Sequence, residues 1–175
     1  DEYLEWCAHN PEDQDVEEYA PEFCGDQESA ECAGIGNTFA SGFRYGILDS
    51  GATSSVGSFE LIQLIADAWE TLERHPVLEN NDGKEFLFAG GEGSPSKVTA
   101  WMPNEVFEEE GVAVNVVPCT STPILIGLGM LRYYGLVLDY AHDTVYSHRL
   151  KRNIPCTVLK SGHLGLSMMP EDGKY

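Results

Sequence analysis

The sequence has few basic residues: 10 Lys and Arg stand against 29 Asp and Glu in 175 residues, a formal net charge of -19 at pH 7. Phosphate binding needs clustered positive side chains, and the one basic cluster is Arg149, Lys151 and Arg152, so direct nucleic-acid binding is not expected. The chain also lacks an apolar run of the roughly 20 residues that cross a bilayer, and it begins without a signal-peptide pattern. These absences favour a cytoplasmic protein that does not contact a membrane.

Cysteine is scarce and odd in number. The five cysteines are spread along the chain without paired spacing: Cys7, Cys24, Cys32, Cys119 and Cys156. This pattern favours reduced thiols over a disulfide framework. A small zinc site from the first three cysteines and His9 is an alternative, but its spacings match no common structural zinc pattern. Since His142, His148 and His163 also lack companion ligands, no metal or organic cofactor is predicted.

The acidic residues are concentrated at the start of the chain. Residues 1–32 contain 12 Asp and Glu and no Lys or Arg, which leaves 17 acidic against 10 basic residues in the remainder. A segment of this charge and low apolar content cannot bury enough surface to fold, so residues 1–33 are predicted to be a disordered linker. Residues 34–148 are then the folded domain and 149–175 a C-terminal extension. Because the chain starts at Asp1 without Met, we expect a piece excised from a polyprotein.

The most informative motif runs from Ile47 to Thr53, with the sequence Ile-Leu-Asp-Ser-Gly-Ala-Thr. An apolar run ends in Asp49, which is followed by turn-forming Ser50 and Gly51. A carboxylate carried out of a buried strand into a tight turn is partly desolvated yet open to a substrate on one side. The motif therefore predicts a catalytic aspartate, although Asp, Ser and Gly also make ordinary turns.

A second segment, residues 122–140, has the pattern of a buried strand over 124–127, a short helix over 129–134 closed by Gly135, and a strand over 136–140. Together, the two segments resemble the retropepsin-like aspartic proteases of retroviruses and LTR retrotransposons. The likeness covers roughly residues 39–148. Residues 86–93, Phe-Leu-Phe-Ala-Gly-Gly-Glu-Gly, make the copia-type retroelement enzymes the most similar.

The resemblance implies a mostly β fold, an acid-protease barrel with one short helix in its C-terminal half. Local patterns add a helix from an N-cap at Ser58 to about Arg74, with a stripe of Leu61, Ile65, Trp69 and Leu72. A turn is predicted at 80–83, and hairpin arms at 84–89 and 97–102 flank a glycine-rich tip. In the family this hairpin is the flap over the substrate. Further strands are predicted at 112–117, 144–147 and 157–160.

The resemblance also implies the chemistry. Asp49 would form a dyad with Asp49 of a second copy, since the chain has one such turn and the reaction needs a base and an acid. Ser50 and Gly51 would brace the turn. Predicted contacts to an extended peptide substrate are these residues: Ala52, Thr53, Ala89, Gly90, Gly91, Gly93 and Ile126. The shared proton and the repulsion between acidic protomers predict an acidic to mildly acidic optimum.

Two of the chain's departures from the family affect a contact of the predicted dimer. Leu128 stands where many viral enzymes have Arg, and Thr53 replaces that residue's acidic partner, so the predicted dimer lacks this salt bridge. A serine hydrolase built on Ser50 is disfavoured because no Gly-x-Ser-x-Gly elbow surrounds it. The open alternative is a silent retropepsin-like module for dimerisation or peptide binding. An active enzyme would act on a polyprotein in a retroelement particle or in the host cytosol.

Overall fold

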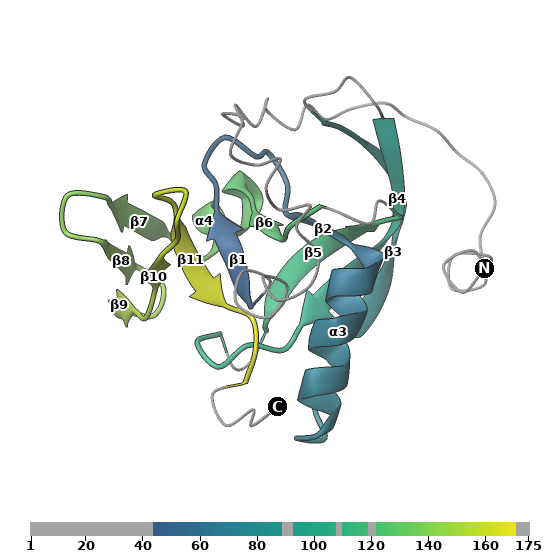
Figure 1. Cartoon of the computed structure of the whole chain (residues 1–175), viewed down its shortest axis with the longest axis horizontal. Coiled ribbons are helices and arrows are strands. Elements are labelled where there is room, and N and C mark those ends of the chain that lie inside the picture. Colours follow the sequence, from purple (N-terminus) through teal and green to yellow (C-terminus); the bar gives the residue numbers. More distant parts are fainter. Residues whose placement is uncertain (1–43, 89–92, 108–109, 119–121, 171–175) are drawn as a thin grey trace.

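The computed structural model describes residues 44–88, 93–107, 110–118 and 122–170, and within these ranges the protein is mostly β (Figure 1). The larger sheet has eight strands, which follow one another in space in the order β10 (Thr157–Val158), β11 (Leu164–Ser167), β1 (Tyr45–Leu48), β6 (Leu125–Ile126), β2 (Val56–Ser58), β5 (Val112–Val117), β4 (Gly93–Met102) and β3 (Val77–Leu87). The smaller sheet has three: β7 (Leu136–Asp139), β8 (Thr144–Ser147) and β9 (Arg152–Ile154). The described helices are α3 (Phe59–Glu70) and α4 (Leu128–Tyr133). The prediction of a mostly β fold is confirmed.

Strand β1 lies between two partners inside the large sheet. It pairs antiparallel with β11 and parallel with β6, with Leu48 opposite Ile126. Strand β6 in turn meets β2, which runs parallel to β5. Because β1 has a neighbour on each side, its direction is fixed and so is the point at which the chain leaves the sheet. That point is Asp49.

Helix α3 covers one face of the sheet near β4 and β5 (Figure 1). Its Leu61, Ile65 and Trp69 are buried at the predicted helical spacing, and Ser58 is the N-cap residue. The helix ends at Glu70, four residues earlier than predicted, and Leu72 is 45% exposed. The indole Nε1 of Trp69 donates a hydrogen bond of 2.8 Å to the carbonyl of Met168, which ties the helix to the C-terminal part of the chain.

Strands β3 and β4 form the predicted hairpin, but its arms are longer than the sequence indicates. The turn predicted at 80–83 is wrong: these residues lie within β3, where the register shifts between Asn80 and Lys84. Pairing with β4 continues on both sides of this bulge, so the chain does not reverse there. Gly83 has a φ of 80°, which explains why the bulge contains a glycine. The tip, residues 89–92, lies outside the described residues.

The C-terminal segment is not an appendage. Strand β11 pairs with β1 at Tyr45 to Ile47, and its Leu164 and Leu166 are at most 1% exposed in the main core. The predicted extension from residue 149 onwards therefore supplies β11, which lies next to β1, the strand that leads to Asp49. The strand predicted over 157–160 is present as the shorter β10.

Tyr134, directly after α4, packs against the loop before β5. Its hydroxyl donates a hydrogen bond of 2.6 Å to the carbonyl of Gly111, and its ring stacks on Phe107 at 3.7 Å. Burial, with a smaller contribution from the charge of Glu110, raises the pKa of Tyr134. A raised folded-state pKa stabilises the protein below the unfolded pKa of about 10, and this contribution is lost as the pH rises further.

We expect Tyr134→Phe to lose stability less steeply than the wild type between about pH 9.5 and about pH 11, because the substituted ring cannot ionise. Urea unfolding at both pH values measures this. Tyr133→Phe is the matched control: Tyr133 is 42% exposed, and this variant should keep the wild-type alkaline decline. Equal declines in Tyr134→Phe and the wild type would contradict the assignment.

Candidate functional site

The predicted catalytic turn follows β1 directly and is held from two sides. The amide of Asp49 donates to the carbonyl of Ile126 at 3.1 Å, which continues the pairing of β1 with β6. The amide of Gly51 donates to Oδ1 of Asp49 at 2.8 Å, so the carboxylate folds over its own turn. Asp49 is partly exposed, and Ser50 and Gly51 are exposed. The turn therefore presents a carboxylate of fixed orientation at the protein surface.

Residues 124–129 clamp the backbone of the turn and of the loop after it. The amide of Gly127 donates to Oγ of Ser55 at 3.1 Å, and that of Leu128 donates to the carbonyl of Ala52 at 2.6 Å. A further bond of 3.2 Å joins the amide of Gly129 to the carbonyl of Thr53. The first amides of α4, which have no partner within the helix, thus bind the loop that carries the aspartate. This close contact is possible because position 127 has no side chain.

The structure brings together only some of the predicted site residues. Asp49, Ser50, Gly51 and Thr53 share the turn and its exposed continuation. Gly93 is the exposed first residue of β4 and pairs with Leu87 near the hairpin tip. The other three flap residues lie outside the described residues: Ala89, Gly90 and Gly91.

Two predicted substrate contacts need correction. Ala52 and Ile126 are each 1% exposed, so neither side chain can line an open cleft. The side chain of Ile126 packs in the main core. Ile126 contributes to the site through its backbone carbonyl, which accepts the amide of Asp49. Ala52 packs in a second, smaller cluster.

That second cluster connects the turn to the hairpin. Its buried members come from the loop, β2, β3, β5 and β6: Ala52, Val56, Phe86, Val117 and Leu125. Ile47 and Phe88 are partly buried against it, and Phe88 adjoins the hairpin tip. Leu125, rather than Ile126, therefore belongs to the face shared by turn and hairpin. The cluster therefore packs the part of the hairpin next to its tip against the loop that follows Asp49.

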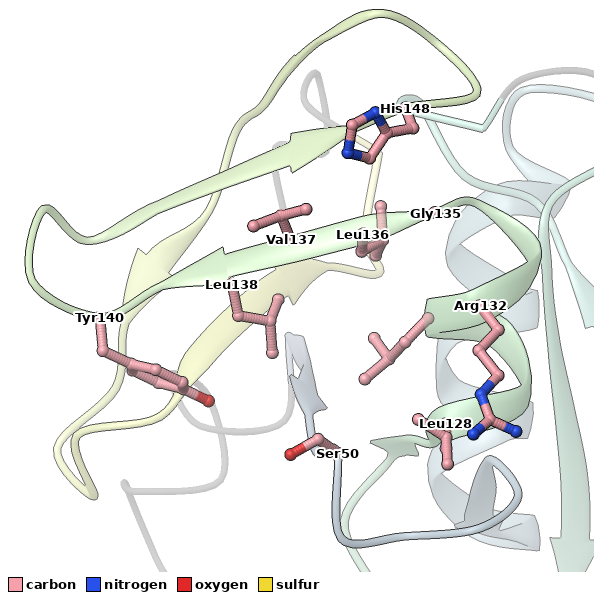
Figure 2. Close-up of a pocket in the computed structure, with 10 residues that line it drawn as sticks. Ser50, Leu128, Arg132, Gly135, Leu136, Val137, Leu138, Tyr140 and His148 are labelled. Atoms are coloured by element: carbon pink, nitrogen blue, oxygen red, sulfur yellow. The ribbon is translucent and has the colours of Figure 1, made fainter.

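A pocket of about 540 Å³ lies on the other side of the turn (Figure 2). Ser50 borders it on one side, and the rest comes from α4, from β7 with the residues at its two ends, and from His148, which follows β8. The lining residues are Ser50, Leu128, Leu131, Arg132, Gly135, Leu136, Val137, Leu138, Tyr140 and His148. The Tyr140 side chain extends from the end of β7 back toward the turn (Figure 2). Burial, and secondarily the charge of Asp49, raises the pKa of Tyr140.

Sequence reasoning missed both the pocket and the polar residues beneath the turn. The pocket combines α4 and β7, whose apolar residues have the pattern of ordinary core. Asn115 holds the loop after the turn through Ser55, with Asn115 Nδ2 donating to the carbonyl of Ser55 at 2.8 Å. A signal for Asn115 was present in the sequence, because it is the one polar residue of the strand Val-Ala-Val-Asn-Val-Val.

Among the described residues, no group of three or more His, Cys, Asp or Glu side chains lies close enough to hold a metal ion. The residues of the alternative zinc site, Cys7, His9, Cys24 and Cys32, are outside those ranges, as is Cys119. Cys156 is a free thiol, and burial raises its pKa. Within the same ranges, none of the helices has the length and apolar character needed to cross a bilayer.

Comparison of the chain with known protein families, with curated proteins and with solved structures finds no match. The family resemblance therefore depends on the motif residues alone.

Proposed function

We propose that this protein is a retropepsin-like aspartic endopeptidase that acts as a homodimer and processes a retrotransposon polyprotein. The observation that carries the proposal is the clamped, surface turn that presents Asp49 at the end of a central strand. Hydrolysis by carboxylates needs one that deprotonates a water and one, protonated, that donates to the scissile carbonyl. Two aspartates held close together share one proton and supply both forms, as aspartic proteases illustrate.

The second aspartate would come from a second copy, and β7 offers an edge for the contact. In the part of the chain that the structure describes, β7 pairs with β8 alone, so its outer edge is open. Val137 and Tyr140 are 48% and 50% exposed, and both line the pocket that Ser50 borders. Antiparallel pairing of β7 with its twin would continue the small sheet through a two-fold axis. It would cover the apolar pocket and bring the two turns toward each other.

Charge on the β7 edge should abolish this contact. We expect Val137→Lys to be monomeric and to lose at least about tenfold in activity at low protein concentration, because a lysine on an edge strand opposes pairing. Sedimentation equilibrium measures the mass. Val158→Lys is the matched control, since Val158 is 47% exposed on β10, the outer strand of the other sheet. A dimeric Val137→Lys protein would exclude this edge as the interface.

The substrate we propose is an extended peptide with apolar side chains. Such a peptide would lie between the turn and the hairpin and pair with strand backbone, with alternate side chains on the apolar surface near Phe88. Digestion of a peptide library between about pH 4 and about pH 7, followed by mass spectrometry of the new termini, tests this. We expect a rate maximum on the acidic side. Binding without cleavage would instead favour a silent peptide-binding module.

A further inference from the structure

A buried polar residue, Asn115, stands at the centre of β5. It is 6% exposed, and its in-register neighbours are Val56 of β2 and Thr99 of β4. Its backbone amide and its Nδ2 both donate to the carbonyl of Ser55, at 2.9 Å and 2.8 Å. Its Oδ1 accepts from Oγ1 of Thr99 and from Nδ2 of Asn81, each at 3.0 Å. One side chain therefore bonds to both the loop after the turn and the hairpin.

On the side of the turn, the next link is Ser55. Its carbonyl is held twice by Asn115, and its Oγ accepts the amide of Gly127 at 3.1 Å. The residue after Gly127 donates to the carbonyl of Ala52, within the motif that contains Asp49. Displacement of Ser55 would therefore disturb both the loop after the turn and the segment at Gly127 that binds this loop. Since Ser55 is 4% exposed, water cannot replace these bonds without a local opening.

On the side of the hairpin, the link is Asn81 in the β3 bulge. Its Nδ2 lies 3.1 Å from Oγ of Ser96, 3.2 Å from Oγ1 of Thr99 and 3.0 Å from Oδ1 of Asn115. The three neighbours require Nδ2 of Asn81, and not its Oδ1, to face them. Oδ1 of Asn115 can only accept, and the hydroxyls of Thr99 and Ser96 already donate to Oδ1 of Asn115 and to the carbonyl of Val98. The bulge thus aims a donor at the network.

The carbonyl side of Asn81 supports a specific need for this donor. Its Oδ1 is buried and has no hydrogen-bond partner among the described residues. A buried acceptor without a partner destabilises the fold, and smaller polar or apolar residues would avoid that penalty. Asn81 therefore leaves its Oδ1 unsatisfied while its Nδ2 makes the bonds to the network.

We propose that Asn115 is a positioning residue that links the hairpin bulge to the catalytic turn, so that the rate of the chemical step depends on hydrogen bonds made by Asn81. The inference rests on the proposed protease function, because it assigns the hairpin and the turn to one reaction. It adds a chain of hydrogen bonds between them, from Asn81 through Asn115 and Ser55 to Gly127.

The test uses isosteric changes in the full chain. Asn81→Asp replaces the donor with a group that repels Oδ1 of Asn115, although Asn81 does not touch the turn. We expect kcat to fall about tenfold while KM changes less than about twofold, and amide exchange at Gly51 and Gly127 to quicken by about tenfold. Thr99→Val, which removes one bond to Asn115 without adding charge, should act in the same direction and more weakly.

Asn104→Asp is the matched control for lost stability. Asn104 is a fully buried amide, whereas Asn81 is partly buried, and it bonds the carbonyl of Ser167 and the amide of Val106, near the other end of β1. This variant should unfold more easily and keep the kcat and the exchange rates at the turn. A kcat and exchange rates at Gly51 and Gly127 that are unchanged in Asn81→Asp and Thr99→Val would overturn the proposed link. Faster exchange in a protein that cleaves no peptide would refute the protease and leave the link standing.

Discussion

Replacing Asp49 with asparagine should lower the rate of peptide cleavage by roughly 10² to 10⁴-fold, the range over which a positioned acid or base contributes to catalysis. Asparagine has nearly the same shape, and its side-chain oxygen can still accept the amide of Gly51, which bonds Oδ1 of Asp49 at 2.8 Å. The turn should therefore remain folded while the site loses its base. Initial rates on a cleaved library peptide, with circular dichroism of the variant, measure both effects.

Asp143→Asn is the matched control for this substitution. Asp143 is exposed in the turn between β7 and β8 and has a φ of 53°, a conformation that asparagine tolerates well. Its activity should equal that of the wild type. Equal activity of Asp49→Asn and the wild type would eliminate the aspartic protease and favour the silent module.

Mixing wild-type and Asp49→Asn protein tests whether the two aspartates of the dyad come from two copies. If a functional dimer needs Asp49 from both copies, adding an equal amount of Asp49→Asn protein should reduce wild-type activity to roughly half, because half of the wild-type chains are drawn into mixed dimers. A monomeric enzyme would keep its full activity in the mixture. The same experiment tests the β7 edge. A protein that carries both Asp49→Asn and Val137→Lys should stay monomeric and should therefore not suppress wild-type activity.

The turn at Asp49 could be predicted because its signal is local. Ile47 and Leu48 indicate a buried strand, and the three residues after them favour a turn wherever they occur, so neighbours in sequence suffice. The helix start at Ser58 and the strand Val112–Val117 were predicted for the same reason. In each case the tertiary contacts agree with the preference of the segment itself.

Other features depend on partners far along the chain. Asn80 to Gly83 has a strong turn composition, but pairing of β3 with β4 on both sides, and the bonds of Asn81 to Ser96 and Asn115, make it a bulge. Strand β11 is four residues long and contains a glycine, so no periodicity identified it. Leu125 and Ile126 form a two-residue strand buried on both faces, and the sequence cannot tell which side chain meets the hairpin.

A methyl group at position 127 should disrupt the site. A Cβ there would come within 2.5 Å of the carbonyl carbon of Ser54, 2.6 Å of its oxygen and 2.8 Å of the carbonyl oxygen of Ala52. All three are backbone atoms, so no side chain can rotate away to make room. The Ala52 oxygen is also the acceptor for the amide of Leu128 at 2.6 Å, so relief of the clash would break the clamp.

We expect Gly127→Ala to lose about 1–3 kcal/mol of stability through this overpacking and to lose at least about tenfold in kcat, because the displaced loop carries Asp49. Urea unfolding and peptide cleavage at saturating substrate measure the two effects. Gly129→Ala, two residues on, is the matched control: its nearest atom is the carbonyl oxygen of Thr53 at 3.8 Å, an ordinary contact, and alanine favours the helix. That variant should be at least as stable as the wild type and fully active. The two substitutions add the same atom to the same segment, and the tight backbone contact is made at 127 alone. Equal behaviour of the two variants would show that the clamp does not hold the turn.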